Sequence, residues 1–283
     1  MMKPINLVAA ALVASFGFSP ALAEPVGPDS DYEAIAPENL LVIDTTKGRI
    51  WVEMTPDIAP LHVERIRLLA GEGFYDNVKW HRVIDGFMAQ TGDPTGTGEG
   101  GSTHGTVKAE LTFRRGPETP FEPVAHPAGY PEGFHHSVPV YSQPDRFFGR
   151  FEDGKATAWG MYCPGVAGMA RDTDENSADS QFFFMRDAYP SLERRYSVWG
   201  RVVVGQDVVN ALKAGDLPSG MVTDPDVMTK VQVASAIPAS ERPGVYRLRP
   251  DSRTFRGIVA TVRQARGADF SPCDIQIPVR IEP

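Results

Sequence analysis

The segment WHRVIDGFMAQTGDPTGTGEGG, residues 80–101, contains one cation, Arg82, among aromatic and aliphatic residues that read as buried sheet. A guanidinium keeps its proton in proteins, so Arg82 cannot act as a general base. Burying its charge without a partner would be costly. Phe87, Met88 and Gln90 follow closely. These residue types suit a ligand that is mostly apolar and presents one amide group.

The length of the turn in this segment decides which side chains share a face with Arg82. If residues 85–87 form a three-residue hairpin loop, Arg82 faces Gln90 and Ile84 faces Met88 across the ladder. A two-residue loop would shift the pairing by one residue and separate the group. The sequence alone leaves both pairings open.

The rest of the chain supplies many short strands and few helices. One helix is expected to end at Gly71 and a second, shorter one at Gly215. Many short strands with only two helices are typical of an all-β sandwich or barrel. The segments expected to contain strands are 40–54, 80–91, 157–171, 180–187 and 227–237, and residues 196–215 are expected to form a strand, a turn and the second helix.

Three segments do not fit this texture. Residues 24–38 are rich in proline and acid and are interpreted as a linker. Residues 112–154 have many prolines and aromatics without periodicity, and we expect an ordered loop insertion on the surface. The C-terminal extension, 239–283, contains seven arginines between Arg242 and Arg266, interpreted as a solvated face. Residues 274–281 alternate as in a half-buried edge strand.

The N-terminal sequence and the net charge indicate the compartment of the protein and the partners that it excludes. Lys3, a short apolar run and the Ala21-Leu22-Ala23 sequence predict a signal peptide over residues 1–23, cleaved after Ala23, and hence an exported, periplasmic protein. Removing one lysine and no acid changes the net charge from -8 to -9. Such an acidic chain argues against nucleic-acid binding. No later segment is apolar enough to span a membrane, and the oligomeric state is left open.

Several blocks, in the same order and spacing, resemble the cyclophilin family of peptidyl-prolyl isomerases. They are HRVIDGFMAQTGD with its glycine-rich loop, then GMARD, NSADSQFFF and SVWGRVVVGQDVV, and the resemblance covers 39–238 apart from the insertion. It implies a closed eight-stranded antiparallel β-barrel with two helices and an active site on its outer face.

The resemblance also assigns roles. Arg82 would be the catalytic arginine, and Gln90 would orient it. The proline pocket would comprise Phe87, Met88, Phe183 and Leu192, and the groove before it Ala170, Arg171, Asp172, Gln181 and Tyr196. In three places the chain departs from many members of the family. Ser191 replaces a tryptophan, Tyr196 replaces a histidine, and Asp172 replaces a small residue.

The expected partners are proline-containing unfolded or exported polypeptides. Amide resonance gives rotation about a peptide bond a barrier of roughly 18–20 kcal/mol, and a guanidinium near the prolyl nitrogen would stabilise the twisted state. No bond breaks, so no cofactor or metal is needed. The main alternative is a peptide-binding module without turnover. A metal-dependent hydrolase using His126, His135 and His136 is weaker, because no third ligand stands at a fixed spacing.

The two cysteines, Cys163 and Cys273, could form a disulfide in an exported chain. Both could equally be small buried residues, as free cysteines often are. If they are bonded, the bridge would hold the C-terminal extension against the barrel.

Overall fold

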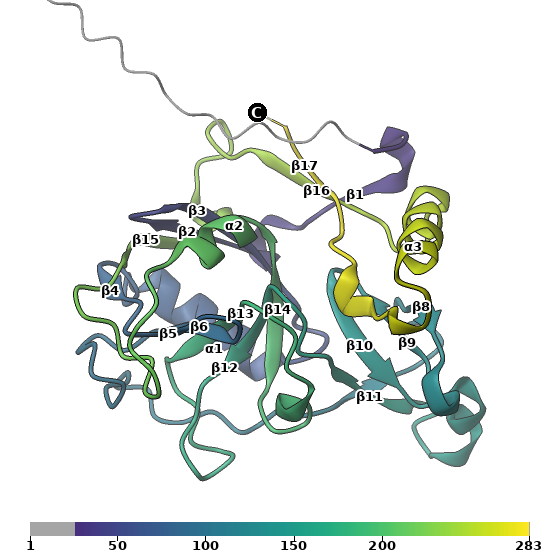
Figure 1. The fold of residues 1–283 in the computed structure, drawn as a ribbon, viewed down its shortest axis with the longest axis horizontal. Coiled ribbons are helices and arrows are strands. Elements are labelled where there is room, and N and C mark those ends of the chain that lie inside the picture. Colours follow the sequence, from purple (N-terminus) through teal and green to yellow (C-terminus); the bar gives the residue numbers. More distant parts are fainter. Residues whose placement is uncertain (1–25, 283) are drawn as a thin grey trace, which may run out of the picture.

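A computed structural model describes residues 26–282 (Figure 1). The expected signal peptide, its cleavage after Ala23 and the first residues of the expected linker lie outside this range. None of the helices in the described range is long and apolar enough to cross a membrane.

A nine-stranded antiparallel sheet carries the expected site. It comprises β2 (Leu40–Thr45), β3 (Gly48–Met54), β4 (Val78–Lys79), β5 (Arg82–Ile84), β6 (Met88–Thr91), β12 (Val166–Met169), β13 (Phe182–Met185), β14 (Val198–Val204) and β15 (Val227–Val233). Their order is β4-β15-β2-β3-β14-β12-β13-β6-β5. The two outermost strands, β4 and β5, are neighbours in the chain, separated only by Trp80 and His81.

The segment 78–84 therefore pairs with β15 through its first part and with β6 through its last part. In this way the sheet curls back on itself. Eight strands were expected and nine are present, because Trp80 and His81 interrupt the segment that joins the two ends. The inner face carries the main core, where Leu41, Val52 and Trp199 are completely buried.

Two helices accompany this sheet, as expected. Helix α1 (Pro60–Gly71) starts with a proline at its first turn, where the missing N–H costs nothing, and α2 (Gln206–Ala211) follows β14. In α1 the buried face runs through Val63, Ile66 and Leu69. Leu61, in the first turn, is 45% exposed.

The insertion is a sheet and not the expected loop. It contributes β7 (Phe113–Arg115), β8 (Glu122–Ala125), β9 (Glu132–His135) and β10 (Val138–Ser142). The fifth strand, β11 (Ala156–Gly160), comes from the next segment, where strands were expected, and the order is β7-β11-β10-β9-β8. Residues on β10, such as Val138 and Val140, join the barrel core, whereas Val124 and Phe134 join a second core under the C-terminal extension. Burial of β9 and β10 on both faces removes the polar–apolar alternation that would have identified these two strands.

The C-terminal extension contains a third helix, α3 (Arg253–Arg266), which the sequence analysis missed. Ser252 caps it by accepting a hydrogen bond from the Phe255 amide at 3.1 Å. Figure 1 shows α3 beside the insertion sheet. Phe255 packs against Phe134 of β9, with ring centroids 5.4 Å apart.

The segment interpreted as a linker also contains a strand. A three-stranded sheet has the order β1-β16-β17 and joins β1 (Tyr32–Ala34) to β16 (Gly244–Leu248) and β17 (Val279–Glu282). The expected strand at 274–281 is thus shorter and later in the chain. Ile275 and Ile277 are buried before it begins.

Covalent and polar contacts hold the extension to the barrel. A disulfide joins Cys163 to Cys273, with 4.8 Å between their Cα atoms. The buried Arg201 of β14 donates to the carbonyl oxygens of Ser137 and Ile275, each at 3.0 Å. One side chain thereby connects the barrel, the turn between β9 and β10, and the extension.

Candidate active site

The expected catalytic arginine, Arg82, lies on the hairpin formed by β5 and β6. Its register pairs Arg82 with Gln90 and Ile84 with Met88, so the loop at 85–87 has three residues. The next strand, β13, pairs Phe183 with Gln90. Directly opposed residues share a face of the sheet, and Arg82, Gln90 and Phe183 therefore form one row across three strands.

Arg82 is half-buried, and its contacts are to neutral groups. Its Nε donates to the Ser219 carbonyl oxygen at 2.9 Å, and its Nη1 lies 3.3 Å from Gln90 Oε1 and 3.8 Å from Met88 Sδ. Within residues 26–282 it forms no ion pair with a carboxylate. Burial lowers the pKa of Arg82, and Tyr196 opposes this shift. A guanidinium starts from so high a pKa that it stays charged at neutral pH.

Two glutamine side chains fix the orientation of the amide beside Arg82. Gln181 Nε2 donates to the carbonyl oxygens of Gly98 and Gly100 at 2.9 and 2.8 Å. A carbonyl can only accept, so Gln181 must turn its Oε1 towards Gln90, whose Nε2 donates to it at 2.9 Å. Gln90 Oε1 is then left to accept from Arg82. We call this chain of contacts, from the glycine loop to Arg82, the glutamine relay.

Aromatic side chains surround Phe183 on the same side of the sheet. Its ring lies 5.9 Å from that of Tyr162 and 5.8 Å from that of Tyr196. Its neighbours Phe182 and Phe184 point the other way, into the core against Trp199. The alternation of strand β13 therefore selects Phe183 from the three consecutive phenylalanines, as expected.

The remaining pocket residues lie at the edges of this apolar floor. Met88 is buried, whereas Phe87 and Leu192 are half-buried and pack against the main core. Phe87 contacts the ring of Tyr189, with centroids 4.6 Å apart. Leu192 ends a short 3-10 helix, Pro190–Leu192, beside Ser191.

The groove residues are held mainly through the backbone. The Ala170 amide donates to the Gln181 carbonyl at 2.9 Å, which extends the sheet beyond β12. Arg171 stacks over the Tyr196 ring at 4.7 Å and donates to the Arg195 and Asp172 carbonyl oxygens at 2.9 and 2.6 Å. Arg171 therefore props the loops beside the groove, while the Asp172 side chain is exposed.

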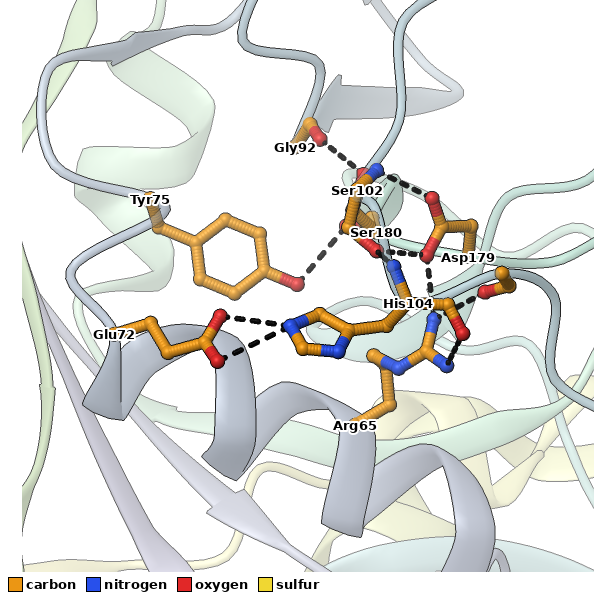
Figure 2. A network of polar contacts seen from close by, with 9 residues as sticks. Arg65, Glu72, Tyr75, Gly92, Ser102, His104, Asp179 and Ser180 are labelled. Atoms are coloured by element: carbon orange, nitrogen blue, oxygen red, sulfur yellow. Dashed lines mark hydrogen bonds and ion pairs between the residues drawn. The ribbon is translucent and has the colours of Figure 1, made fainter.

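A second polar network, which the sequence analysis missed, connects α1 to the segment just before Gln181 (Figure 2). Asp179 Oδ1 accepts two hydrogen bonds, each 2.5 Å long, one from Arg65 Nη1 of α1 and one from the Ser102 hydroxyl. His104 faces Glu72 at 2.9 Å. Asp179 precedes Gln181 by two residues. The network therefore holds the segment just before β13, which carries Gln181 of the glutamine relay. Its sequence signal was the acid in NSADSQFFF.

Buried groups around Ser180 complete the same network. The Tyr75 hydroxyl donates to the Ser180 carbonyl at 3.0 Å, and the Ser180 hydroxyl donates to the Gly92 carbonyl at 2.7 Å (Figure 2). A side chain on Gly92 would collide with the Ser180 carbonyl, because a Cβ atom there would lie 2.4 Å from that oxygen. Gly92 thus allows the end of β6 to approach the strand that carries Gln181.

The glycine-rich loop is closed on itself and is unsuited to a phosphate. Asp93 accepts hydrogen bonds from the amides of Thr95, Thr97 and Gly98 at 2.7, 2.9 and 2.6 Å. Burial alone would raise the pKa of Asp93, but hydrogen bonds from the Thr95 hydroxyl and from the amides of Thr95, Gly100 and Gly98 hold it far below its usual value. The amides that a phosphate cradle would offer are already used.

Three comparisons place this geometry among known proteins. The family described as cyclophilin type peptidyl-prolyl cis-trans isomerase matches residues 40–235. A probable peptidyl-prolyl cis-trans isomerase of Brucella suis is 32% identical over 220 residues, covering 74% of this chain and 89% of the relative. The solved cyclophilin AquaCyp293 of Hirschia baltica superposes with a TM-score of 0.81 at 33% identity, covering 89% of this chain and 93% of that one.

The match to AquaCyp293 covers 89% of this chain, which is more than residues 40–235 alone. The AquaCyp293 chain therefore also shares part of the structure outside that range. The family match, the curled sheet and the row of Arg82, Gln90 and Phe183 agree with one another. The chain belongs to the cyclophilin family and is a peptidyl-prolyl cis-trans isomerase.

Proposed function

We propose that this protein assists the folding of exported polypeptides by isomerising X-Pro bonds through Arg82. The observation that carries the proposal is the set of contacts around Arg82, a cation beside an apolar floor whose partners are an amide and a carbonyl. No carboxylate in the described chain neutralises it. Its charge is therefore available to a substrate.

The reaction needs that charge at one atom. Twisting the X-Pro amide ends its resonance and localises a lone pair on the prolyl nitrogen. A guanidinium N–H directed at that nitrogen stabilises the twisted state more than either planar isomer, and this difference lowers the barrier. The glutamine relay keeps Gln90 Oε1 facing Arg82, so the guanidinium is held in place before substrate arrives.

The apolar floor performs the second task, which is to hold the proline ring. Phe183, Met88 and Leu192 offer apolar surface, while the amides beside them bind peptide backbone. A ring held here stays fixed while the residue before it rotates. No proton transfer is required, so no general acid or base takes part.

Two features support a role outside the cytoplasm. The sequence of residues 1–23 has the pattern of a signal peptide. Disulfides such as Cys163–Cys273 persist in oxidising compartments. Cell fractionation, with determination of the N-terminal residue of the mature protein, tests this part. A cytoplasmic protein that retains residues 1–23 would contradict it.

A protease-coupled assay on Ala-Ala-X-Pro peptides tests the catalytic part. Wild type should accelerate isomerisation, Arg82→Ala should lose most of the rate, and Arg82→Lys should show whether a charge of different geometry suffices. If wild type binds the peptides without accelerating isomerisation, it is a binding module and the catalytic proposal is wrong.

A further inference from the structure

Three side chains that are distant in sequence converge at the junction between the barrel and the insertion sheet. They are Asp57, in the loop between β3 and α1, His135 at the end of β9, and His136 in the following turn. One ligand atom from each lies within 4.8 Å of the others. The sequence shows no third ligand at a fixed spacing from these histidines, and the fold supplies one in Asp57. None of the three belongs to the groove around Arg82.

The tautomer of His135 is set by its surroundings. The side chain is 1% exposed, and its Nδ1 lies 2.7 Å from the Pro120 carbonyl oxygen, which can only accept. In the neutral ring Nδ1 therefore holds the proton, and Nε2 has its lone pair directed away from that carbonyl. This Nε2 atom is buried and has no hydrogen-bond partner. Metal-binding histidines commonly donate their other nitrogen to a carbonyl in this way.

The His135 lone pair faces a second acceptor. Asp57 Oδ2 lies 3.4 Å from His135 Nε2 and 3.8 Å from His136 Nε2. Two acceptors at this distance repel each other unless a proton or a cation lies between them. Two ligands bound to a tetrahedral zinc ion at about 2.1 Å lie about 3.4 Å apart. The spacing of Asp57 and His135 matches that value, whereas the three ligand atoms together are only within 4.8 Å of one another, so the His136 ring must move inward when an ion binds.

The charges around the cluster favour a cation despite the presence of Arg247. This arginine pairs with Glu53 at 2.7 Å and with Glu33 at 2.8 Å, so its charge is already balanced. Asp57, beside the two histidines, is a further carboxylate that Arg247 does not pair with. Arg247 Nη2 also contacts His136 Nδ1. Ligation through His136 Nε2 would move the ring proton to Nδ1 and displace this contact, while Arg247 would keep both carboxylates.

The backbone at His136 is another sign that this ring is held in place. Its φ is 54°, in the left-handed region that non-glycine residues seldom adopt. Such strain tends to occur at functional sites. The turn places His136 against His135, with ring centroids 4.5 Å apart, and so directs both imidazoles to the side occupied by Asp57.

We propose that Asp57, His135 and His136 bind one divalent transition-metal ion, with water at the remaining positions. Two imidazoles and a carboxylate suit Zn²⁺ and its neighbours in the first transition series. The Asp57 side chain is 60% exposed, which gives the ion a path of entry and leaves room for water. The bound ion links the insertion sheet to the loop before α1 and is a structural cross-link.

The test uses full-length protein stripped with a chelator and titrated with Co²⁺, whose visible absorption reports ligand geometry. Wild type should bind one ion per chain with a tetrahedral or five-coordinate spectrum, and Zn²⁺ should displace it. Asp57→Asn keeps the shape of an exposed side chain and should weaken binding at least tenfold. His126→Ala removes an exposed histidine of the same insertion and is the matched control.

Thermal unfolding gives a second readout that does not depend on the spectrum. Zn²⁺ should raise the Tm of wild type and of His126→Ala, because a ligand that binds only the folded state stabilises it. It should leave the Tm of Asp57→Asn nearly unchanged. Absence of stoichiometric binding by wild type would overturn the proposal and leave His135 and Asp57 as a proton-bridged pair. Equal binding by wild type and Asp57→Asn would overturn it as well.

Discussion

Arg82 and Arg247 both project from strands next to apolar cores, but their partners differ. Arg247 is 3% exposed and pairs with two carboxylates, one of which, Glu53, is itself buried. Arg82 is half-buried and contacts an amide, a carbonyl and a thioether. A buried charge that is fully paired contributes to structure, whereas one that is solvated only by neutral dipoles retains its field for a ligand. Partners and burial together separate the two roles, because Arg201 also contacts only neutral carbonyls but is 4% exposed and closed to a ligand.

The largest effect should follow from removing the structural arginine. Arg247→Ala leaves Glu53 buried without its cation, and breaking such a pair typically costs about 3–5 kcal/mol. Burial already raises the pKa of Glu53, and Arg247 opposes that rise. Because the folded-state pKa lies above the unfolded one, the protonated form favours folding, and this stability is lost as pH rises.

The deficit of Arg247→Ala should therefore be smaller at pH 5 than at pH 8 in urea unfolding. Adding Glu53→Gln should recover part of the loss at pH 8, because the amide needs no counter-charge. A deficit that does not change with pH would mean that Glu53 is not the group left without a partner.

Removing Arg82, the proposed catalytic residue, should affect rate and not stability. Arg82→Ala should lower kcat/KM a hundredfold or more, corresponding to about 2.7–4 kcal/mol for one transition-state hydrogen bond. Its free energy of unfolding should change by less than about 0.5 kcal/mol, as for most substitutions outside the core. Protease-coupled kinetics and urea unfolding on the same preparation check both values. If Arg82→Ala loses much stability and little rate, Arg82 is a structural residue like Arg247.

The glutamine relay should have a smaller, graded effect. Gln181→Leu removes the group that orients Gln90, at a cost of about 0.5–1.5 kcal/mol for one net hydrogen bond, which lowers kcat/KM roughly two- to tenfold. Gln232→Leu, on β15 away from Arg82, is the control. If Gln181→Leu keeps the wild-type rate, Arg82 is positioned without the relay.

The smallest effect is on how the free energy of unfolding depends on pH. Burial, followed by the charge of Glu132, raises the pKa of Glu193 to about 7, while Trp159 opposes the shift. The protonated form therefore stabilises the fold below pH 7, and this contribution should be lost as pH rises through 7. Glu193→Gln should abolish that part of the pH dependence in unfolding experiments.

Catalysis itself should vary little between pH 6 and 9. Arg82 stays charged, and burial lowers the pKa of His81, which keeps its ring neutral in this range. A rate profile with two limbs in wild type would indicate a general acid and base, contrary to the proposed mechanism.

The sequence predicted the barrel side of the molecule well because local patterns carry that information. Strand alternation selected Phe183 from three phenylalanines, and one of two possible loop lengths placed Arg82 beside Gln90. The family blocks supplied the remaining assignments. The insertion was misread because β9 and β10 are covered on both faces, which removes any period of two.

Other features depend on contacts between distant segments. Asp57 meets His135 only because the insertion folds back onto the loop before α1. Asp179 meets Arg65 across the glycine loop, and helix α3 was obscured by its arginines, four of which lie on its exposed face. No periodicity within a short window can report such pairings.

The three-stranded sheet has a consequence for the order of assembly. Val42, Trp51 and Val203, on the outer face of the barrel, are covered together with Val245 of β16. About 200 residues separate Val42 from Val245, so ribosomal synthesis completes the barrel strands before their cover exists. During that interval the growing chain displays an apolar patch of its own. The barrel strands alone therefore leave an apolar patch that only the last-made part of the chain can cover.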